Sequence, residues 1–199
     1  MARLGAGRSG VTARADYHHG DLAAAALDEA LGLIAADGEA RFSLRALADR
    51  LGVAHRALYN HFADREALLA AVAARGFAQL ADGLAAASEP ATFLAAYVRF
   101  ARGYPGLYAV MTERHHAQIN ATPSLRAAVD RVIAVALAVL ATPDADEDTR
   151  RREVMRVWML AHGAIGLQRA GMLRLRSDAD FIDEVLRIAG LVPPQEKAP

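Results

Sequence analysis

The sequence contains no cysteine among its 199 residues. This absence excludes a disulfide framework, a zinc site built on thiolates and a cysteine nucleophile. The longest apolar run, Val132–Ala141, is much shorter than the roughly 20 residues that a membrane-spanning helix needs. The arginines near the N-terminus are not followed by the apolar stretch of a secretory signal. We therefore expect a soluble, cytoplasmic protein that does not contact membranes.

Neither sign of charge is in excess, because 23 basic residues balance 23 acidic ones. A neutral chain is not expected to be covered in nucleic acid, but it can carry a small basic face. Between Arg41 and Phe62, four arginines accompany a single acid, Asp49. This local excess indicates a surface that can face a polyanion. An ordinary solvated face is the alternative for Arg41, Arg45 and Arg50.

Patterns that carry catalysis are also lacking. The sequence has no nucleophile elbow, phosphate-binding loop, metal-binding box or paired carboxylates. An enzymatic site would have to use Glu113, His115, His116 and His162. Adjacent histidines such as His115 and His116 point about 100° apart on a helix, which does not suit a shared metal ion. We predict that the protein is not an enzyme and that it holds no metal or cofactor.

Helical periodicity covers nearly the whole chain, and the alternation typical of strands is absent. We therefore predict an all-α fold. Several start and stop signals support it, such as Ser43 before a short helix, Gly52 after it, and the pair Thr122 and Pro123. Helices are expected at about residues 21–36, 44–51, 54–61, 64–87, 88–103, 105–114, 122–141, 149–170 and 177–189.

The segment from Ser43 to Phe62 has the pattern of a helix-turn-helix unit. Leucines spaced for one buried face occur in both short helices, and Gly52 permits the sharp turn between them. The outward face of the second helix carries side chains that can reach base edges or phosphates. These side chains are His55, Arg56, Tyr59 and Asn60. Ordinary core packing is the alternative for Tyr59 and Phe62.

The residues that follow make this pattern specific. Leu58-Tyr59-x-His61-Phe62, followed by Arg65-Glu66-x-Leu68-Leu69, resembles the signature that closes the DNA-binding domain of TetR-family regulators. Residues 17–22 resemble the start of the first helix in one branch of that family, so the resemblance covers about residues 17–77. It implies that Ser43, Tyr59, His61 and Arg65 contact the DNA backbone. The predicted DNA-binding set is Ser43, Arg45, His55, Arg56, Tyr59, Asn60, His61 and Arg65.

The chain departs from the family pattern at the start of the reading helix. Ala54 stands where the family usually has a serine or threonine cap, and the loss of such a cap costs about 1 kcal/mol. His55 and Arg56 stand where the family often has lysine and a small residue. The operator sequence therefore does not follow from the resemblance.

The second half of the chain places aromatic and methionine side chains at helical spacing. Trp158-x-x-x-His162-Gly163 resembles the signature of a Trp-His-Gly (WHG) C-terminal domain found in some TetR-like regulators, and residues 100–111 resemble its companion motif. Soft apolar bodies with polar tips suit a pocket for a small, mostly apolar ligand, although simple core packing is the alternative. The predicted lining is Phe93, Tyr97, Phe100, Tyr104, Met111, Met155, Trp158, Met159 and His162.

Together these features predict a homodimeric, ligand-responsive repressor that binds a palindromic DNA operator. We expect a flexible arm (1–16), a helix-turn-helix DNA-binding domain (17–77), a helical-bundle domain for ligand binding and dimerisation (78–192) and a loose tail (193–199). The last two helices form the dimer interface in the family, and Gly163, Ala164 and Gly166 are compatible with close contact there. One alternative is a helical small-molecule-binding protein with degenerate DNA binding, because Ala54-His55-Arg56 is unusual.

Overall fold

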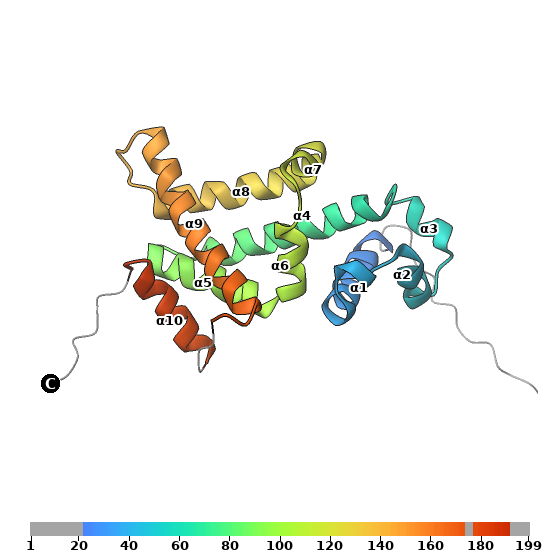
Figure 1. The fold of residues 1–199 in the computed structure, drawn as a ribbon. Helices are drawn as coiled ribbons and strands as arrows, with labels where there is room; N and C mark the ends of the chain where they lie inside the picture. Colours follow the sequence, from blue (N-terminus) through green and yellow to red (C-terminus); the bar gives the residue numbers. More distant parts are fainter. Residues whose placement is uncertain (1–21, 174–176, 192–199) are drawn as a thin grey trace, which may run out of the picture.

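The computed structural model describes residues 22–173 and 177–191, and within them it contains ten α-helices, one short 3₁₀ helix and no strand (Figure 1). The predicted all-α fold is confirmed, while the predicted arm and tail lie outside the described residues. The elements are α1 (Leu22–Asp37), η1 (Glu39–Arg41), α2 (Leu44–Leu51), α3 (His55–Tyr59), α4 (Arg65–Leu84), α5 (Pro90–Gly103), α6 (Pro105–Thr112), α7 (His116–Ala121), α8 (Pro123–Leu140), α9 (Glu147–Arg169) and α10 (Asp178–Ile188).

The first short helices begin and end at the signals that the sequence carries. The Ser43 hydroxyl accepts a hydrogen bond from the Ala46 N–H at 3.2 Å, so it caps α2. Gly52 ends α2 in the left-handed conformation, with φ of 66°, which other residues adopt only under strain. The next helix, α3, is shorter than predicted. Ala54 offers no side-chain cap, and regular helix ends at Tyr59.

The long helix α4 joins the two halves of the molecule, and in Figure 1 it runs from the α1–α3 unit to the α5–α10 unit. It packs against α1 of the first unit and against α5, α6 and α8 of the second. By length and composition α4 could cross a membrane, but half of its apolar window is buried in the protein, as expected of a core helix. Its composition therefore follows from its central position.

Helix α6 packs closely against both halves because two glycines give it room. A Cβ at Gly76 in α4 would lie 2.6 Å from Met111 Sδ and 2.7 Å from Leu107 Cδ1. A Cβ at Gly106 would lie 3.3 Å from Ala35 Cα in α1. Since α6 contacts α1, α4 and α5, a displacement of α6 would change packing contacts in both halves of the molecule.

One helix was not predicted. Helix α7 forms over His116–Ala121 with a capping-box arrangement of His115 and Gln118, in which the His115 N–H donates to Gln118 Oε1 at 3.1 Å. Histidine is not among the favoured capping residues, so no start signal is recognisable in the sequence. The structure therefore gives His115 a place in a helix cap.

Helices α9 and α10 leave apolar side chains on the outside of the C-terminal half. Met159 and Leu167 in α9 are 57% and 42% exposed, and Ile188 in α10 is 65% exposed. Added Cβ atoms at Gly163 and Gly166 would meet no other atom within 4 Å. The outer face of α9 is thus apolar and has no side chains at Gly163 and Gly166, which suits close contact with another helix.

Candidate functional site

Helix α3 presents the predicted DNA-reading side chains on one exposed face. Leu58 is fully buried and Phe62 nearly so, and they hold α3 against the N-terminal core. His55, Arg56, Tyr59, Asn60 and His61 all lie at the surface, and Arg45 of α2 is exposed as well. The His55 and Tyr59 rings meet edge to face with centroids 5.0 Å apart. The structure thus gathers hydrogen-bond donors and cationic groups on one exposed surface.

Ser43, the predicted phosphate-binding residue before α2, is also exposed. Its hydroxyl oxygen is used in capping α2, but the side chain is exposed and its proton is not needed for the cap. A hydroxyl can accept one hydrogen bond and donate another. Ser43 can therefore cap α2 and donate to a phosphate at the same time.

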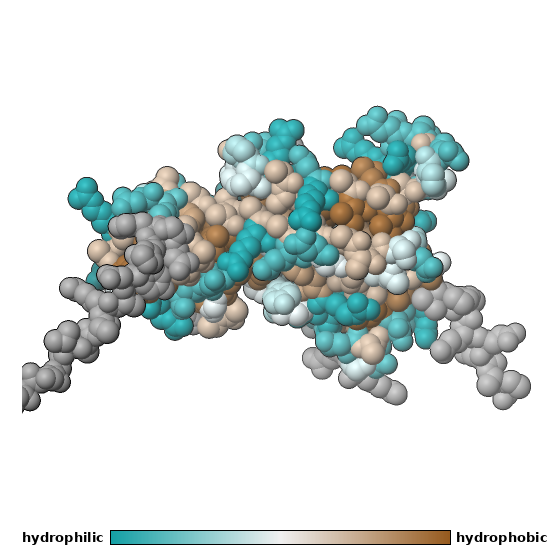
Figure 2. Space-filling view, turned by 180° about the vertical axis from the view of Figure 1, so that it is seen from behind, coloured by the Kyte–Doolittle hydropathy of each residue, from teal (hydrophilic) through white to brown (hydrophobic). Residues whose placement is uncertain are grey.

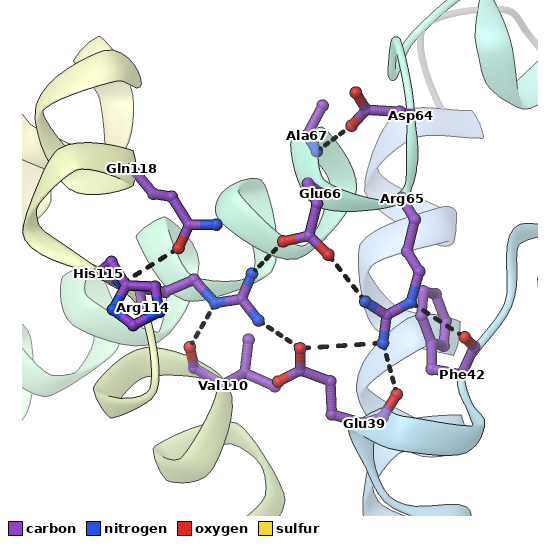
Figure 3. Close-up of polar contacts among 10 residues, drawn as sticks. All are labelled: Glu39, Phe42, Asp64, Arg65, Glu66, Ala67, Val110, Arg114, His115 and Gln118. Atoms are coloured by element: carbon purple, nitrogen blue, oxygen red, sulfur yellow. Dashed lines mark hydrogen bonds and ion pairs between the residues drawn. The ribbon is translucent and has the colours of Figure 1, made fainter.

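Arg65, which the resemblance assigns to the DNA backbone, is bound to three groups of the protein. Its Nε donates to the Phe42 carbonyl at 3.1 Å, its Nη2 to the Glu39 carbonyl at 2.6 Å, and its Nη1 to Glu66 Oε1 at 2.8 Å (Figure 3). The guanidinium also lies over the Phe42 ring, 5.9 Å from its centroid. Most of its donors are used inside the protein, so Arg65 holds the start of α4 against η1 instead of projecting freely.

Arg114, which sequence reasoning missed, occupies the other side of the same two glutamates. Its Nε donates to the Val110 carbonyl at 3.2 Å, its Nη1 to Glu66 Oε2 at 2.7 Å, and its Nη2 pairs with Glu39 (Figure 3). The Arg114 side chain is only 6% exposed. Arg65, Arg114, Glu39 and Glu66 therefore form one balanced group of charges, which we term the arginine–glutamate cluster.

The arginine–glutamate cluster links three separate parts of the chain. Glu39 belongs to η1, which leads into α2, while Arg65 and Glu66 begin α4, and Arg114 follows α6. Its members lie up to 75 positions apart in sequence, so no local pattern could have revealed it. The cluster ties the segment that positions the helix-turn-helix unit to the segment that ends at the C-terminal bundle.

A cavity of about 500 Å³ lies in the C-terminal half, between α8 and α9 and over α4, α5 and α6. Figure 2 shows apolar surface gathered beneath the α8–α9 turn and bordered by hydrophilic side chains. The wall contains no acidic residue. Its lining is Phe77, Leu80, Phe93, Leu94, Tyr97, Tyr108, Met111, Thr112, Arg114, Ile119, Val129, Val132, Ile133, Ala136, Leu140, Arg151, Val154, Met155, Val157, Trp158 and Ala161.

The structure places five of the nine predicted pocket residues in this wall, namely Phe93, Tyr97, Met111, Met155 and Trp158. The other four do not line it. Phe100 pairs with Tyr104 at 5.3 Å between centroids, and Tyr104, between α5 and α6, and Met159 in α9 are largely exposed. His162 lies behind Trp158, on which it stacks at 5.5 Å. Helical spacing placed these residues near the cavity but did not fix the side that each one faces.

The main residues missed are those of α8. Val129, Val132, Ile133, Ala136 and Leu140 line the cavity at i, i+3, i+4, i+7 and i+11, which is one face of a helix. This regular spacing could have been found in the sequence. The predicted lining was instead based on aromatic and methionine side chains, most of which lie in α5 and α9.

Three polar side chains beside the cavity, Tyr97, Tyr108 and His162, form a chain of hydrogen bonds. The Tyr97 and Tyr108 hydroxyl oxygens are 3.1 Å apart, and the Tyr108 hydroxyl lies 2.8 Å from His162 Nδ1. When His162 Nδ1 accepts from the Tyr108 hydroxyl, that hydroxyl can accept from the Tyr97 hydroxyl in turn, so both tyrosine protons are used within the protein.

The two tyrosines in this chain are held as neutral phenols. Burial raises the pKa of Tyr97 above its usual value. Burial also raises the pKa of Tyr108, and the neighbouring Tyr97 raises it further. Both hydroxyls therefore keep their protons over the whole range in which the protein is handled.

Comparison with known proteins identifies two matching families. Residues 26–72 match the family of bacterial regulatory proteins of tetR type, and residues 91–188 match the tetracyclin repressor-like C-terminal domain. This second match does not resolve the Trp-His-Gly branch, which stays a prediction. Among curated proteins, none matches the sequence significantly.

Solved structures give the same picture of the fold. A protein of unknown function from Rhodococcus sp. RHA1 is 30% identical, with 88% of this chain and 95% of that chain covered and a TM-score of 0.71. A possible TetR family transcriptional regulator from Streptomyces coelicolor A3(2) is 21% identical, with 84% and 80% covered and a TM-score of 0.60. The second likeness, at this identity, concerns the fold alone.

Proposed function

Because the chain belongs to the TetR family of bacterial regulatory proteins, we propose that it is a homodimeric repressor that releases a palindromic operator when a small effector fills its cavity. TetR-family regulators are DNA-binding proteins without enzymatic activity. The observation that carries the proposal is the exposed face of α3 in a helix-turn-helix unit whose preceding segment, η1, is bound through Glu39 to Arg114 of the cavity wall. Residues 17–77 would serve DNA binding and residues 78–192 ligand binding and dimerisation, in the cytoplasm.

On the DNA side, α3 would enter the major groove. Arg56 can donate two hydrogen bonds to a guanine, and Asn60 can pair with an adenine. Tyr59, His61 and Ser43 can donate to phosphates, which positions the helix without reading sequence. Arg65 would support this surface indirectly, by holding η1 and the start of α4 together.

The coupling between cavity and DNA would run through α6 and the arginine–glutamate cluster. Met111 and Arg114 belong to the cavity wall, and Arg114 binds Glu39 in η1. An occupant that displaces the end of α6 therefore also displaces the segment that leads into α2. This mechanism requires the effector to bind more tightly to the conformation that does not fit the operator.

The homodimer would form through α9 and α10, whose outer faces carry Met159, Leu167 and Ile188 with Gly163 and Gly166 between them. A two-fold axis there would place two copies of α3 against half-sites about one helical turn of DNA apart, or a multiple of it. The effector would change the separation of the two readers.

The DNA-binding part is tested by fluorescence anisotropy with labelled DNA from the region that flanks the gene, at two salt concentrations. Specific binding should survive competitor DNA, and its salt dependence should report the phosphate contacts. Arg56→Ala should weaken it by about tenfold or more, since a bidentate contact to a base contributes about 1–3 kcal/mol. Arg99→Ala, at an exposed position on α5, is the matched control.

Weak binding of equal strength to all DNA sequences, unaffected by Arg56→Ala, would contradict the proposed repressor function. It would favour the alternative of a helical small-molecule-binding protein with degenerate DNA binding, for which the uncapped, five-residue α3 is the supporting observation.

The coupling is tested with Arg114→Met, which keeps an apolar stem in the wall and removes the charge from the cluster. Hydrogen exchange in η1 and α2 should accelerate, because Glu39 loses its partner from α6. Arg126→Met, which breaks an exposed pair with Asp130 within α8, should leave exchange there unchanged. Unchanged exchange in the Arg114 variant would show that the cluster does not transmit the signal.

A further inference from the structure

The proposed effector is small and mostly apolar, and the charged residues of the cavity wall indicate which polar group it carries. We propose that the cavity binds an elongated apolar molecule with one carboxylate, and that Arg151 binds this carboxylate at the rim. The inference rests on the proposed function only for its regulatory meaning, since binding itself concerns the C-terminal half.

The shape of the cavity favours an elongated occupant. Its lining along α8 extends from Val129 to Leu140, twelve residues that span about 16 Å of helix. A second apolar stripe on α9 faces the same space with Val154, Met155 and Trp158. The volume of about 500 Å³ lies within the range of roughly 300–1,000 Å³ typical of small-molecule sites. An extended hydrocarbon body would thus contact apolar surface along its length.

The hydroxyls of the wall do not offer free donors to a ligand. The Tyr97 and Tyr108 hydroxyls use their protons in the chain that ends at His162 Nδ1. The Thr112 hydroxyl donates to the Tyr108 carbonyl at 2.8 Å. A polar head group placed among them would be buried without full hydrogen bonding, which is costly.

The two cations of the wall differ in what they can offer. Arg114 already binds the Val110 carbonyl, Glu39 and Glu66, so its charge is balanced. Arg151 is exposed and has no hydrogen bond or ion pair with any residue that the structure describes. Because no acid lines the cavity, a ligand with a negative group finds its complement in Arg151, and that group can remain partly hydrated at the rim.

The position of Arg151 also sets the orientation of the ligand. It stands near the start of α9, close in sequence to the α8–α9 turn, whereas Arg114, Ile119 and Val129 line the opposite end near α7. A carboxylate on Arg151 therefore directs the apolar body along α8 toward the end of α6. The apolar end of the ligand would then press on the wall that contains Met111 and Arg114.

The test uses dodecanoate and 1-dodecanol, which differ at the head group, with the full chain and no DNA. Trp158 is the only tryptophan and lies in the wall, so its fluorescence reports occupancy directly. Dodecanoate should bind about tenfold more tightly than 1-dodecanol, because hydrogen bonds to a charged group are stronger than those to a neutral one. Arg151→Gln should remove this preference, and Arg151→Lys should keep most of it.

Arg152→Gln is the matched control, because Arg152 is the next residue along α9, donates to Thr149 and does not line the cavity. It should bind both probes as the unmodified protein does. Equal affinities of the unmodified protein for the two probes, binding of neither, or the same loss in both variants would each overturn the proposal. Since these measurements contain no DNA, a failure of operator binding would leave their outcome unaffected.

Discussion

The hydroxyls of Tyr97 and Tyr108 show how single buried atoms shape the cavity. Each is satisfied within the protein, so the polar tips that drew attention in the sequence fix the wall in place and are not free for a ligand. In the sequence these tyrosines were indistinguishable from the exposed Tyr104. The difference arises from packing between α5, α6 and α9, which helical spacing alone does not encode.

The protein should lose stability as the pH rises above 10. Burial raises the pKa values of Tyr97 and Tyr108 in the folded protein above the 10.0 that applies to the unfolded chain. The unfolded state therefore loses these protons first, and folding becomes less favourable as pH rises through that range, with no such loss below it. Urea unfolding across this range measures the effect.

Tyr108→Phe should weaken the alkaline loss of stability, whereas Tyr104→Phe, at an exposed position, should leave it unchanged. The Tyr108 variant should also cost about 1 kcal/mol near neutral pH, because Tyr97 and His162 each lose a hydrogen-bond partner. An identical alkaline slope in both variants would contradict the assignment to the buried tyrosines.

Two glycines of α4 should respond in opposite ways to the same substitution. Gly76→Ala places a methyl group against Met111 and Leu107, so we expect a loss of about 1–3 kcal/mol from overpacking, partly offset by better helix propensity. Gly83→Ala meets open space and should gain up to about 1 kcal/mol. Urea unfolding measures both variants.

Because Met111 lines the cavity, Gly76→Ala should also weaken the binding of dodecanoate, as followed by Trp158 fluorescence. Gly83→Ala should not change this binding. A stabilised Gly76→Ala variant with unaltered ligand affinity would show that α6 is not held against α4 as closely as its packing implies.

At the scale of elements, helices whose ends are marked by capping residues could be predicted from the sequence. Features that depend on contacts between distant segments could not. Helix α2 matches its expected bounds because Ser43 and Gly52 specify both ends. Helix α7 was missed because its cap is a histidine. The cavity was anticipated from α5 and α9, but α8 and the arginine–glutamate cluster depend on contacts between distant segments.

The reading helix α3 should be stabilised by restoring its cap. Ala54 already has the extended backbone of a capping residue but no side-chain acceptor. Ala54→Ser should therefore gain about 0.5–1 kcal/mol. Urea unfolding measures this gain, and slower hydrogen exchange in α3 would locate it.

Ala86→Ser, at an exposed residue just after α4, should stay within about 0.5 kcal/mol of the unmodified protein. If the two serine variants are equally stable, α3 gains nothing from a capping hydroxyl and is limited by some other contact.

At the scale of the whole molecule, the proposed dimer should depend on the apolar outer face of α9 around Gly163. Gly163→Arg should produce monomers, because a long charged side chain would enter the interface. The protomer itself should still fold, since a Cβ at this position meets no other atom within 4 Å. Sedimentation velocity measures the change.

Gly32→Arg makes the same change at an open glycine within α1 and should leave the dimer intact. Dimers that persist in the Gly163 variant would place the interface on another surface.

The cavity also bears on how long the protein survives in the cell. An effector that fills the cavity of about 500 Å³ binds the folded chain and not the unfolded one, so it stabilises the folded state. At a concentration of 100 times the dissociation constant this linkage contributes about 2.7 kcal/mol, and changes of that size alter the steady-state amount of a protein exposed to proteases. The effector would then govern the abundance of the regulator as well as its hold on DNA, so that the cell accumulates its sensor while the signal lasts.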